Sequence, residues 1–404
     1  MSAPFSEITG GVTAPEGFVA AAGYAAIKEG SKRKFDIALI HSPVPTVAAA
    51  TFTTNRVKAA PVRVSMAHLR SADIRAIVAN SGNANACTGC IGIEHAKRMT
   101  RAAAAALKLR ERQVLVCSTG RIGVGMPIED IERHIAALPK GLNKHGSQNA
   151  ARAIMTSDTF PKEIAVEMKL GDKRVRIGGI AKGAGMIDPN MATMLCFLTT
   201  DAAIGKKELQ NAMSIAVEQS FNRITIDGDM STNDTAILLA NGLAGNAPLR
   251  RASPEAKLFQ SALNYVTRAL ACMMVEDGEG VSKFVEVQVT GAATFQDARK
   301  AAEAVANSTL VKCAWFGGDP NWGRIMDAVG YSTARIREEM IDIFYDGVIA
   351  VKNGMASKTP FAKLREIAAG KRFKVTIDLH LGSAEYTVFT SDLTTRYVEL
   401  NMGE

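Results

Sequence analysis

Short apolar runs of strand length recur along the whole chain, and helix-like stretches separate them. In the run Lys374–Leu381, the apolar residues Val375, Ile377 and Leu379 alternate with polar ones, which is typical of a strand with one buried face. Along Glu255–Val275 the apolar residues recur at three-to-five-residue steps, as they do on the buried face of a helix. Strands and helices mixed in this way predict an α/β or α+β fold.

The remaining predicted elements follow the same two patterns. The other strands are expected at Phe35–Ile40, Ile74–Ala79, Val114–Cys117, Ile164–Met168, Thr193–Leu198 and Phe284–Val289. The other helices are expected at His95–Leu109, Lys207–Ser220 and Ala298–Ala306. Ser253 and Pro254 precede the helix Glu255–Val275 as an N-cap and a first-turn proline. A chain of 404 residues predicts two or three packed units, although no repeat or long polar linker marks a boundary.

Composition narrows the class of protein. No apolar run approaches the ~20 residues of a membrane span, and the N-terminal residues lack the basic and apolar stretches of a signal peptide. We therefore expect a cytoplasmic protein without a membrane partner. The net charge of +8 raises the question of nucleic acid, but the basic residues are scattered and only 6% of the chain is aromatic. This favours a solvated basic surface, which is compatible with an anionic small substrate, and we expect no nucleic-acid partner.

The six cysteines predict reduced thiols, because the chain carries no export signal. Cys87 and Cys90 form a Cys-x-x-Cys pair, a spacing that occurs in half of a zinc site and in redox motifs. No second pair of this kind and no paired-histidine motif completes a metal set. We therefore expect no metal site and expect the cysteines to pack as small core residues. Zinc or redox chemistry at the pair is the alternative.

Four short stretches are rich in small hydroxyl, amide and glycine residues, and each follows an apolar run. They are Asn80–Ala86, Cys117–Gly120, Lys182–Thr193 and Asp277–Gly280. Each is expected at the end of a buried element. Glycine permits close backbone approach, and free N–H groups can line an oxyanion hole. Taken singly, each stretch is also typical of a tight turn.

Thr193 occupies a chemically distinctive junction, between the glycine-rich stretch and the apolar run Met194–Leu198. Its hydroxyl could attack the preceding carbonyl, and hydrolysis after the N→O acyl shift would leave Thr193 as a new N-terminus. The freed α-amine, with a reference pKa of about 7.7–8.0, could then deprotonate the hydroxyl. One residue would thereby supply both nucleophile and base without a histidine.

Long ordered strings in the chain resemble the ornithine acetyltransferase family, also called glutamate N-acetyltransferase. KGAGMIDPNMATML, with Thr193 at the cleavage position, resembles the self-processing motif of that family. The resemblance covers nearly the whole chain. Its other strings are Phe52–Pro61, NSGNANACTG at Asn80–Gly89, STG at Ser118–Gly120, MTSDTFPK at Met155–Lys162, SFNRITIDGDMSTNDT at Ser220–Thr235, DGEG at Asp277–Gly280 and FGGDPNWGRI at Phe316–Ile325.

The resemblance implies an architecture and a set of site residues. The fold would have stacked β-sheets flanked by helices, similar to the self-processing aminopeptidases and N-terminal nucleophile hydrolases. Self-cleavage between Ala192 and Thr193 would give an α chain of residues 1–192 and a β chain of residues 193–404, co-folded and paired as α2β2. Thr193 would be the nucleophile, and Thr119 and Gly120 would form the oxyanion hole. The implied substrate contacts are Thr156, Lys182, Thr193, Glu279 and Asn401.

The reaction implied by the resemblance transfers acetyl from N2-acetyl-L-ornithine to L-glutamate in arginine biosynthesis. It would pass through acetyl-Thr193 with ping-pong kinetics and need no cofactor, and the use of acetyl-CoA as a second acetyl donor stays open. Lys182 suits the substrate α-carboxylate. Glu279 suits either the ornithine side-chain ammonium or a proton-transfer role.

One departure and two alternatives accompany this interpretation. After Asn401 the chain reads Met402-Gly403-Glu404, without the terminal Ser or Thr that usually adds a substrate contact in the family, so another residue or a water would replace that contact. The first alternative is an aminopeptidase or amidase of the same architecture that releases the acyl group to water. The second is a basic nucleic-acid-binding or nucleotide-binding protein with no covalent step.

Overall fold

The computed structural model describes residues 4–27, 34–188 and 194–402. They form two compact units. Unit 1 comprises residues 1–183, 190–222 and 230–274, and unit 2 comprises residues 184–189, 223–229 and 275–404. The predicted cleavage point between Ala192 and Thr193 lies outside the described residues.

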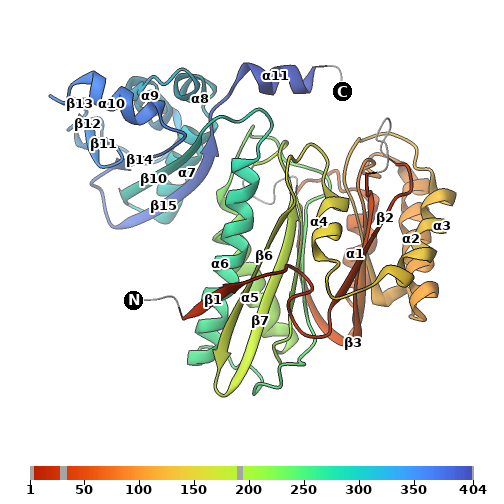
Figure 1. The fold of residues 1–404 in the computed structure, drawn as a ribbon. Helices are drawn as coiled ribbons and strands as arrows, with labels where there is room; N and C mark the ends of the chain where they lie inside the picture. The colour runs from red at the N-terminus through yellow and green to blue at the C-terminus, as the bar shows by residue number, and fades with distance from the viewer. Residues whose placement is uncertain (1–3, 28–33, 189–193, 403–404) are drawn as a thin grey trace. The chain divides into compact units, whose positions relative to one another are not determined.

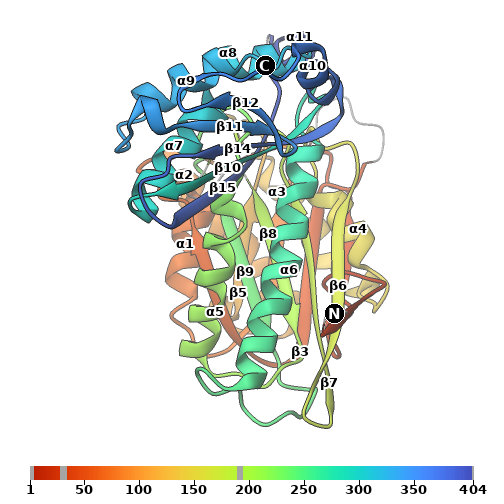
Figure 2. The same ribbon diagram turned by 90° about the vertical axis from the view of Figure 1, so that its left-hand side faces the viewer.

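Unit 1 is built on a nine-stranded sheet with the order β1-β6-β7-β8-β9-β3-β4-β5, in which β2 also pairs with β3 (Figure 2). The strands are β1 Phe5–Ile8, β2 Val19–Gly23, β3 Ile37–Phe52, β4 Ile74–Asn80, β5 Val114–Ser118, β6 Lys162–Leu170, β7 Lys173–Lys182, β8 Leu195–Thr200 and β9 Thr235–Ala240. Strands β4 and β5 are parallel, as are β8 and β9, and the other neighbours are antiparallel.

The long strand β3 divides this sheet into two stacked halves. Its first part pairs with β2 and β4, its second part pairs with β9, and the register on β4 shifts between His41 and Thr46. One core cluster takes Ile40 from the first part, Ala48 from the second, Leu115 from β5 and Phe197 from β8. The two halves therefore bury a shared core, into which α4 (Ser147–Ile154) also packs.

Helices cover both outer sides of unit 1 (Figure 1). On one side lie α5 (Lys206–Glu218) and α6 (Pro254–Glu276), and on the other α1 (Ala60–His68), α2 (Gly89–Leu107) and α3 (Ile128–Ala137). A second core cluster joins α2 and α3 to β4 and β5, with Met99 and Ile131 packed near Val78 and Val116. The predicted class, with stacked sheets flanked by helices, is confirmed.

Unit 2 has a six-stranded sheet in the order β13-β12-β11-β14-β10-β15. The strands are β10 Phe284–Ala292, β11 Asp342–Tyr345, β12 Val348–Lys352, β13 Met355–Ala356, β14 Arg372–Asp378 and β15 Ala384–Ser391. The helices are α7 Phe295–Asn307, α8 Thr309–Phe316, α9 Trp322–Tyr331, α10 Phe361–Ala369 and α11 Thr395–Asn401. Short 3₁₀ turns complete the described chain at Glu111–Gln113, Leu138–Gly141, Phe221–Arg223 and Glu338–Met340.

The predicted periodicities correspond to observed elements. Val375, Ile377 and Leu379 are buried in and just after β14, and the amphipathic stretch Glu255–Val275 forms α6. The Ser253 hydroxyl accepts a hydrogen bond from the backbone N–H of Ala256 at 3.1 Å, so the predicted cap is confirmed. No helix in the described part of the chain is long and apolar enough to span a membrane.

Candidate active site

The predicted site residues are distributed over both units. Thr119 and Gly120 follow β5, Thr156 follows α4, and Lys182 ends β7, all in unit 1. Glu279 lies between α6 and β10, and Asn401 ends α11, both in unit 2. Ala192 and Thr193 lie outside the described residues.

Two of the predicted small-residue stretches meet at one edge of the sheet. Strands β4 and β5 are parallel and end in register, with Asn80 opposite Ser118. The stretches that follow them therefore start side by side, and the Thr119 N–H donates to the Asn80 carbonyl at 3.0 Å. Asn83 forms isolated bridges with Thr119 and Arg121. The expectation that these stretches lie at the ends of buried elements is confirmed.

Gly120 occupies a position that only glycine fits. Its φ is +128°, and a Cβ there would lie 2.3 Å from the backbone carbonyl carbon of Gly82 and 2.6 Å from the nitrogen of Asn83. Because the Thr119 N–H is committed to Asn80, the donor that Thr119 can offer a ligand is its hydroxyl. Among the described residues the Gly120 N–H has no acceptor. The two groups left for an oxyanion are therefore one hydroxyl and one backbone N–H.

Lys182 is the cation next to this pair. It is 2% exposed, and its Nζ lies 3.4 Å from the Thr119 hydroxyl oxygen. A buried ammonium is stable only where carboxylates or polar groups replace its hydration shell. The nearby carboxylates of Asp158 and Asp234 are therefore part of the site.

Asp158, which the sequence analysis did not single out, connects several predicted residues. Its Oδ1 accepts from the Lys162 Nζ at 2.7 Å and from the Gly183 N–H at 2.8 Å, and its Oδ2 accepts from the Thr156 N–H at 2.9 Å. Burial alone would raise the pKa of Asp158, but the charges of Lys182 and Lys162 outweigh burial and lower that pKa to about 2. This carboxylate fixes the backbone at Thr156 and beyond Lys182. The sequence held one indication of this role, because Asp158 lies in the family string MTSDTFPK, two residues after the predicted contact Thr156.

Asp234 holds the chain just after Thr193. Its Oδ1 accepts from the Met194 N–H at 2.9 Å, and the Met194 carbonyl accepts from the Thr235 N–H at 3.1 Å. Burial raises the pKa of Asp234 well above its ordinary range, and the charge of Lys182 opposes that rise only in part. The residue that follows Thr193 is thus fixed on both sides by the start of β9.

In unit 2 the structure brings Glu279 and Asn401 together. The Asn401 side-chain amide donates to the Glu279 Oε2 at 3.0 Å and to the Tyr397 carbonyl at 2.9 Å. The Glu279 N–H donates to the Ala184 carbonyl at 2.8 Å. Gly185 leaves room for this carboxylate, since a Cβ at that position would lie 2.7 Å from it.

Asp227 supports the same cluster and was also missed from the sequence. It accepts from the N–H groups of Met186 and Ile187 at 2.6 and 2.8 Å, and from the Tyr397 hydroxyl at 3.2 Å. Burial raises the pKa of Asp227, and burial together with the Asp227 charge raises the pKa of Tyr397. Asp227 therefore joins α11, which carries Asn401, to the segment that precedes Thr193.

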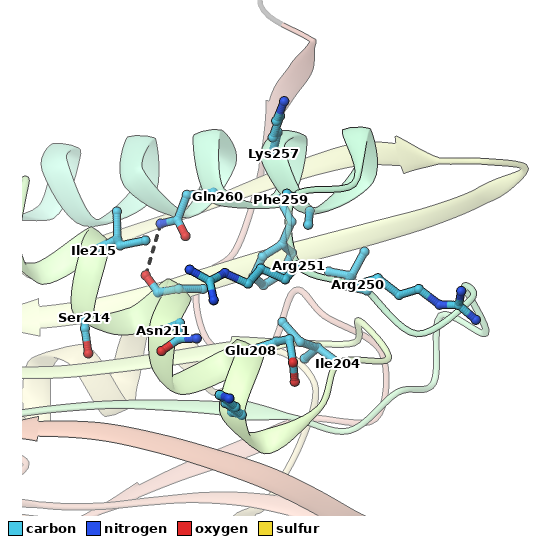
Figure 3. A pocket seen from close by; sticks show the side chains of 15 residues that line it. Ile204, Glu208, Asn211, Ser214, Ile215, Arg250, Arg251, Lys257, Phe259 and Gln260 are labelled. Atoms are coloured by element: carbon cyan, nitrogen blue, oxygen red, sulfur yellow. Dashed lines mark hydrogen bonds between the residues drawn. The ribbon is translucent and has the colours of Figure 1, made fainter.

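A cavity of about 570 Å³ between α5 and α6 contains none of these residues (Figure 3). Its floor includes Ile215 and Phe259, and Gln260 donates to the Ala212 carbonyl at 3.0 Å across it. Arg251 lies along the cavity, whereas Arg250 extends away from it (Figure 3). Cavity size alone would therefore not lead to the predicted residues.

The expectation for the cysteines is wrong in part. Cys117 and Cys196 are buried, but Cys87, Cys90 and Cys313 are exposed and Cys272 is half-buried. Cys87 and Cys90 lie in the turn that starts α2, where the chain passes over the surface, so they do not pack in the core. Within the described residues no group of three or more His, Cys, Asp or Glu side chains could hold a metal ion.

Comparison with known proteins assigns the chain to a class and a family. Residues 19–403 match the model of the ArgJ family. The arginine biosynthesis bifunctional protein ArgJ of Geobacter sulfurreducens is 50% identical over 387 residues, covering 96% of this chain and 98% of the relative. The glutamate N-acetyltransferase of Methanocaldococcus jannaschii is 49% identical over 406 residues, covering 98% of each. The chain is an acyltransferase, and it belongs to the ArgJ family.

Among solved structures, the ornithine acetyltransferase of Mycobacterium tuberculosis, in complex with ornithine, is similar to part of the chain. The sequence identity is 36% and the TM-score 0.43, over 47% of this chain and 100% of that one.

Proposed function

We propose that this enzyme transfers the acetyl group of N2-acetyl-L-ornithine to L-glutamate in arginine biosynthesis. The proposal includes self-cleavage between Ala192 and Thr193 and an acetyl-Thr193 intermediate. The full-length similarity to proteins named for arginine biosynthesis and for glutamate N-acetylation supports the reaction class. The observation that carries the site assignment is the grouping of the Thr119 hydroxyl, the Gly120 N–H and the Lys182 ammonium at the ends of β5 and β7.

In the proposed mechanism Thr193 Oγ attacks the acetyl carbonyl while its α-amine accepts the hydroxyl proton. The carbonyl oxygen becomes an oxyanion, and the Thr119 hydroxyl and Gly120 N–H donate to it. Each such donor contributes about 10²–10³ in rate at comparable sites. The α-amine then gives the proton to the departing ornithine nitrogen, which leaves acetyl-Thr193. The hydrogen bond from the Met194 N–H to Asp234 at 2.9 Å supports this role, because it fixes the chain next to the proposed nucleophile.

Glutamate would then enter, and its α-amine would attack the carbonyl of acetyl-Thr193. The Thr119 hydroxyl and the Gly120 N–H would again donate to the oxyanion, and Thr193 Oγ would be the leaving group. Both substrates carry an α-carboxylate, which we assign to Lys182. We assign the ornithine side-chain ammonium to Glu279, whose carboxylate Asn401 orients. Thr193, its amine and the substrate amines account for every proton and acyl transfer, so the proposed cycle needs no cofactor. We further propose that the α and β chains stay paired and assemble as α2β2.

Intact mass and an assay with two acceptors test this function. The wild-type protein should split into two chains at 192/193, and incubation with acetyl-ornithine alone should add one acetyl group to the chain that begins at Thr193. Thr193→Ala should stay a single chain, because alanine has no oxygen to start the acyl shift. Acetyl-glutamate should appear only when glutamate is present. Release of free acetate at the same rate without glutamate would identify a hydrolase instead, and cleavage of the Thr193→Ala variant would refute self-processing by Thr193.

A further inference from the structure

Cys87 and Cys90 occupy a place in the fold where paired cysteines carry out redox chemistry. They follow β4 and open α2, and α2 leads to β5, which is parallel to β4. This is a β-α-β unit with a Cys-x-x-Cys pair at the start of its helix, the context in which that spacing indicates a thiol–disulfide function rather than chance. The acyl-transfer site described above uses neither cysteine.

The local geometry exposes both thiols to a common space. Cys87 and Cys90 line the same cavity of about 280 Å³, together with Val57, Lys58, Arg63 and Ile93. Cys87 has a φ of +58°, an uncommon value for a residue with a side chain, and Gly89, which precedes Cys90, has a φ of +60°. The chain therefore turns sharply between the two cysteines, and both line the cavity.

The charged residues that line this cavity, Lys58 and Arg63, are both cations. The Thr88 hydroxyl donates to Asn85 Oδ1 at 2.8 Å, and in the described structure no side chain caps the first N–H groups of α2. The first turn of α2 contains no acidic residue. Lys58 donates from its Nζ to the Asn55 carbonyl at 2.6 Å, and Arg63 donates from its Nε to the Lys58 carbonyl at 3.2 Å, so hydrogen bonds to the backbone hold both cations in the cavity lining. The N-terminus of α2 adds partial positive charge on the same side of the chain turn, and its first turn carries no carboxylate.

We propose that Cys87 and Cys90 form a redox-active dithiol that exchanges with small anionic disulfides. One cysteine thiolate attacks a sulfur of the small disulfide, whose S–S bond breaks, and the first small thiol leaves. The other cysteine thiolate attacks the protein sulfur of this mixed disulfide, forms the Cys87–Cys90 bond and expels the second small thiol. The two protein thiols are oxidised, the small disulfide is reduced to two thiols, and the two protein protons end on them.

Intact mass after incubation with glutathione disulfide tests the proposal. Cys313 is exposed but has no cysteine three residues away, so the experiment uses the full chain with Cys313→Ser. This protein should lose two hydrogen atoms in mass and lose two maleimide-reactive thiols, with peptide mapping placing the bond at Cys87–Cys90. Adding Cys87→Ser or Cys90→Ser should instead trap one stable glutathionyl group. Two glutathionyl groups on the unmutated pair, or two thiols left free at excess glutathione disulfide, would overturn the proposal.

The charge of the small disulfide supplies a second, independent test. Arg63→Gln should slow the reaction with anionic glutathione disulfide several-fold and leave the reaction with neutral 2-hydroxyethyl disulfide unchanged. Arg56→Gln, a nearby basic position outside the cavity lining, is the matched control. Equal slowing with both disulfides would show that Arg63 supports the local fold rather than recognition of an anion. Neither experiment depends on acyl transfer, so the two proposals can fail separately.

Discussion

Removing the Thr119 hydroxyl separates catalysis from folding at the proposed oxyanion site. In Thr119→Ala the backbone N–H still donates to the Asn80 carbonyl, so the link between the ends of β4 and β5 is kept. The hydroxyl's contact with Lys182 is long, at 3.4 Å. We therefore expect a stability cost of about 1 kcal/mol. Loss of one oxyanion donor should lower kcat by about 10²–10³, or roughly 2.7–4 kcal/mol of transition-state stabilisation.

The assay compares kcat and KM for acetyl-ornithine with glutamate in excess, and urea unfolding of the same samples gives the stability change. Thr119→Ser is the matched control, because it restores the hydroxyl and should recover most of kcat. A Thr119→Ala enzyme with unchanged kcat and a raised KM would make Thr119 a ground-state contact and refute its oxyanion role. A fall in stability large enough to account for the lost activity would show that the Thr119 hydroxyl acts in folding rather than in catalysis.

Three other changes probe the rest of the site. Gly120→Ala should lower the free energy of unfolding by well over the roughly 1–3 kcal/mol of a strained φ, because the added Cβ would meet backbone atoms. Gly123→Ala is the control, since Gly123 has a φ of +76° and open space around it, and it should show only the cost of the strained φ. Urea unfolding measures both changes. Asp158→Asn should lower the free energy of unfolding by about 3–5 kcal/mol, because it removes the carboxylate that pairs with Lys162. Asp172→Asn, which removes an exposed carboxylate paired with Lys173, is the control and should change the free energy of unfolding little. The pKa of Asp158 is lowered to about 2 in the folded protein, so its carboxylate contributes to the free energy of unfolding above pH ~4 and loses that contribution as the pH falls towards 2. Asp158→Asn should not show this loss. Tyr397→Phe should raise the KM for acetyl-ornithine several-fold with kcat little changed, because it frees α11 from Asp227, and an effect on kcat alone would contradict this positioning role.

Much of the fold could be predicted because local patterns and tertiary structure agree. The strands at Ile74–Ala79 and Val114–Cys117 match β4 and β5 within a residue, since both are short runs of mostly buried apolar residues, with Arg75 as the exception in β4. The strand expected at Phe35–Ile40 was too short, because β3 continues to Phe52. Pro43 and Pro45 interrupt its pattern and lack ladder N–H groups, and only pairing with β4 and β9 carries the strand past them.

The candidate site was predictable where it depends on small residues and was missed where it depends on charge. Thr119 and Gly120 belong to a stretch whose composition indicates a tight backbone approach, and the contact of Gly120 with Gly82 provides the reason. Asp158 and Asp227 were overlooked because a single aspartate in a loop is typical of a turn. Their importance comes from donors distant in sequence, such as Gly183 for Asp158 and Tyr397 for Asp227, which local patterns do not show.

The charges around Lys182 explain how one contact could serve both substrates of the proposed cycle. Lys162 pairs with the Asp158 carboxylate at 2.7 Å, and the charges of Lys182 and Lys162 outweigh burial and lower the pKa of Asp158 to about 2, so both cations act on this one carboxylate. Burial raises the pKa of Asp234, the other carboxylate that the charge of Lys182 acts on, well above its ordinary range. A buried ammonium is stabilised further by an anion that binds next to it. The α-carboxylate common to acetyl-ornithine and glutamate is such an anion, so each substrate in turn would gain the same stabilisation, and the difference between their side chains would fall to residues elsewhere.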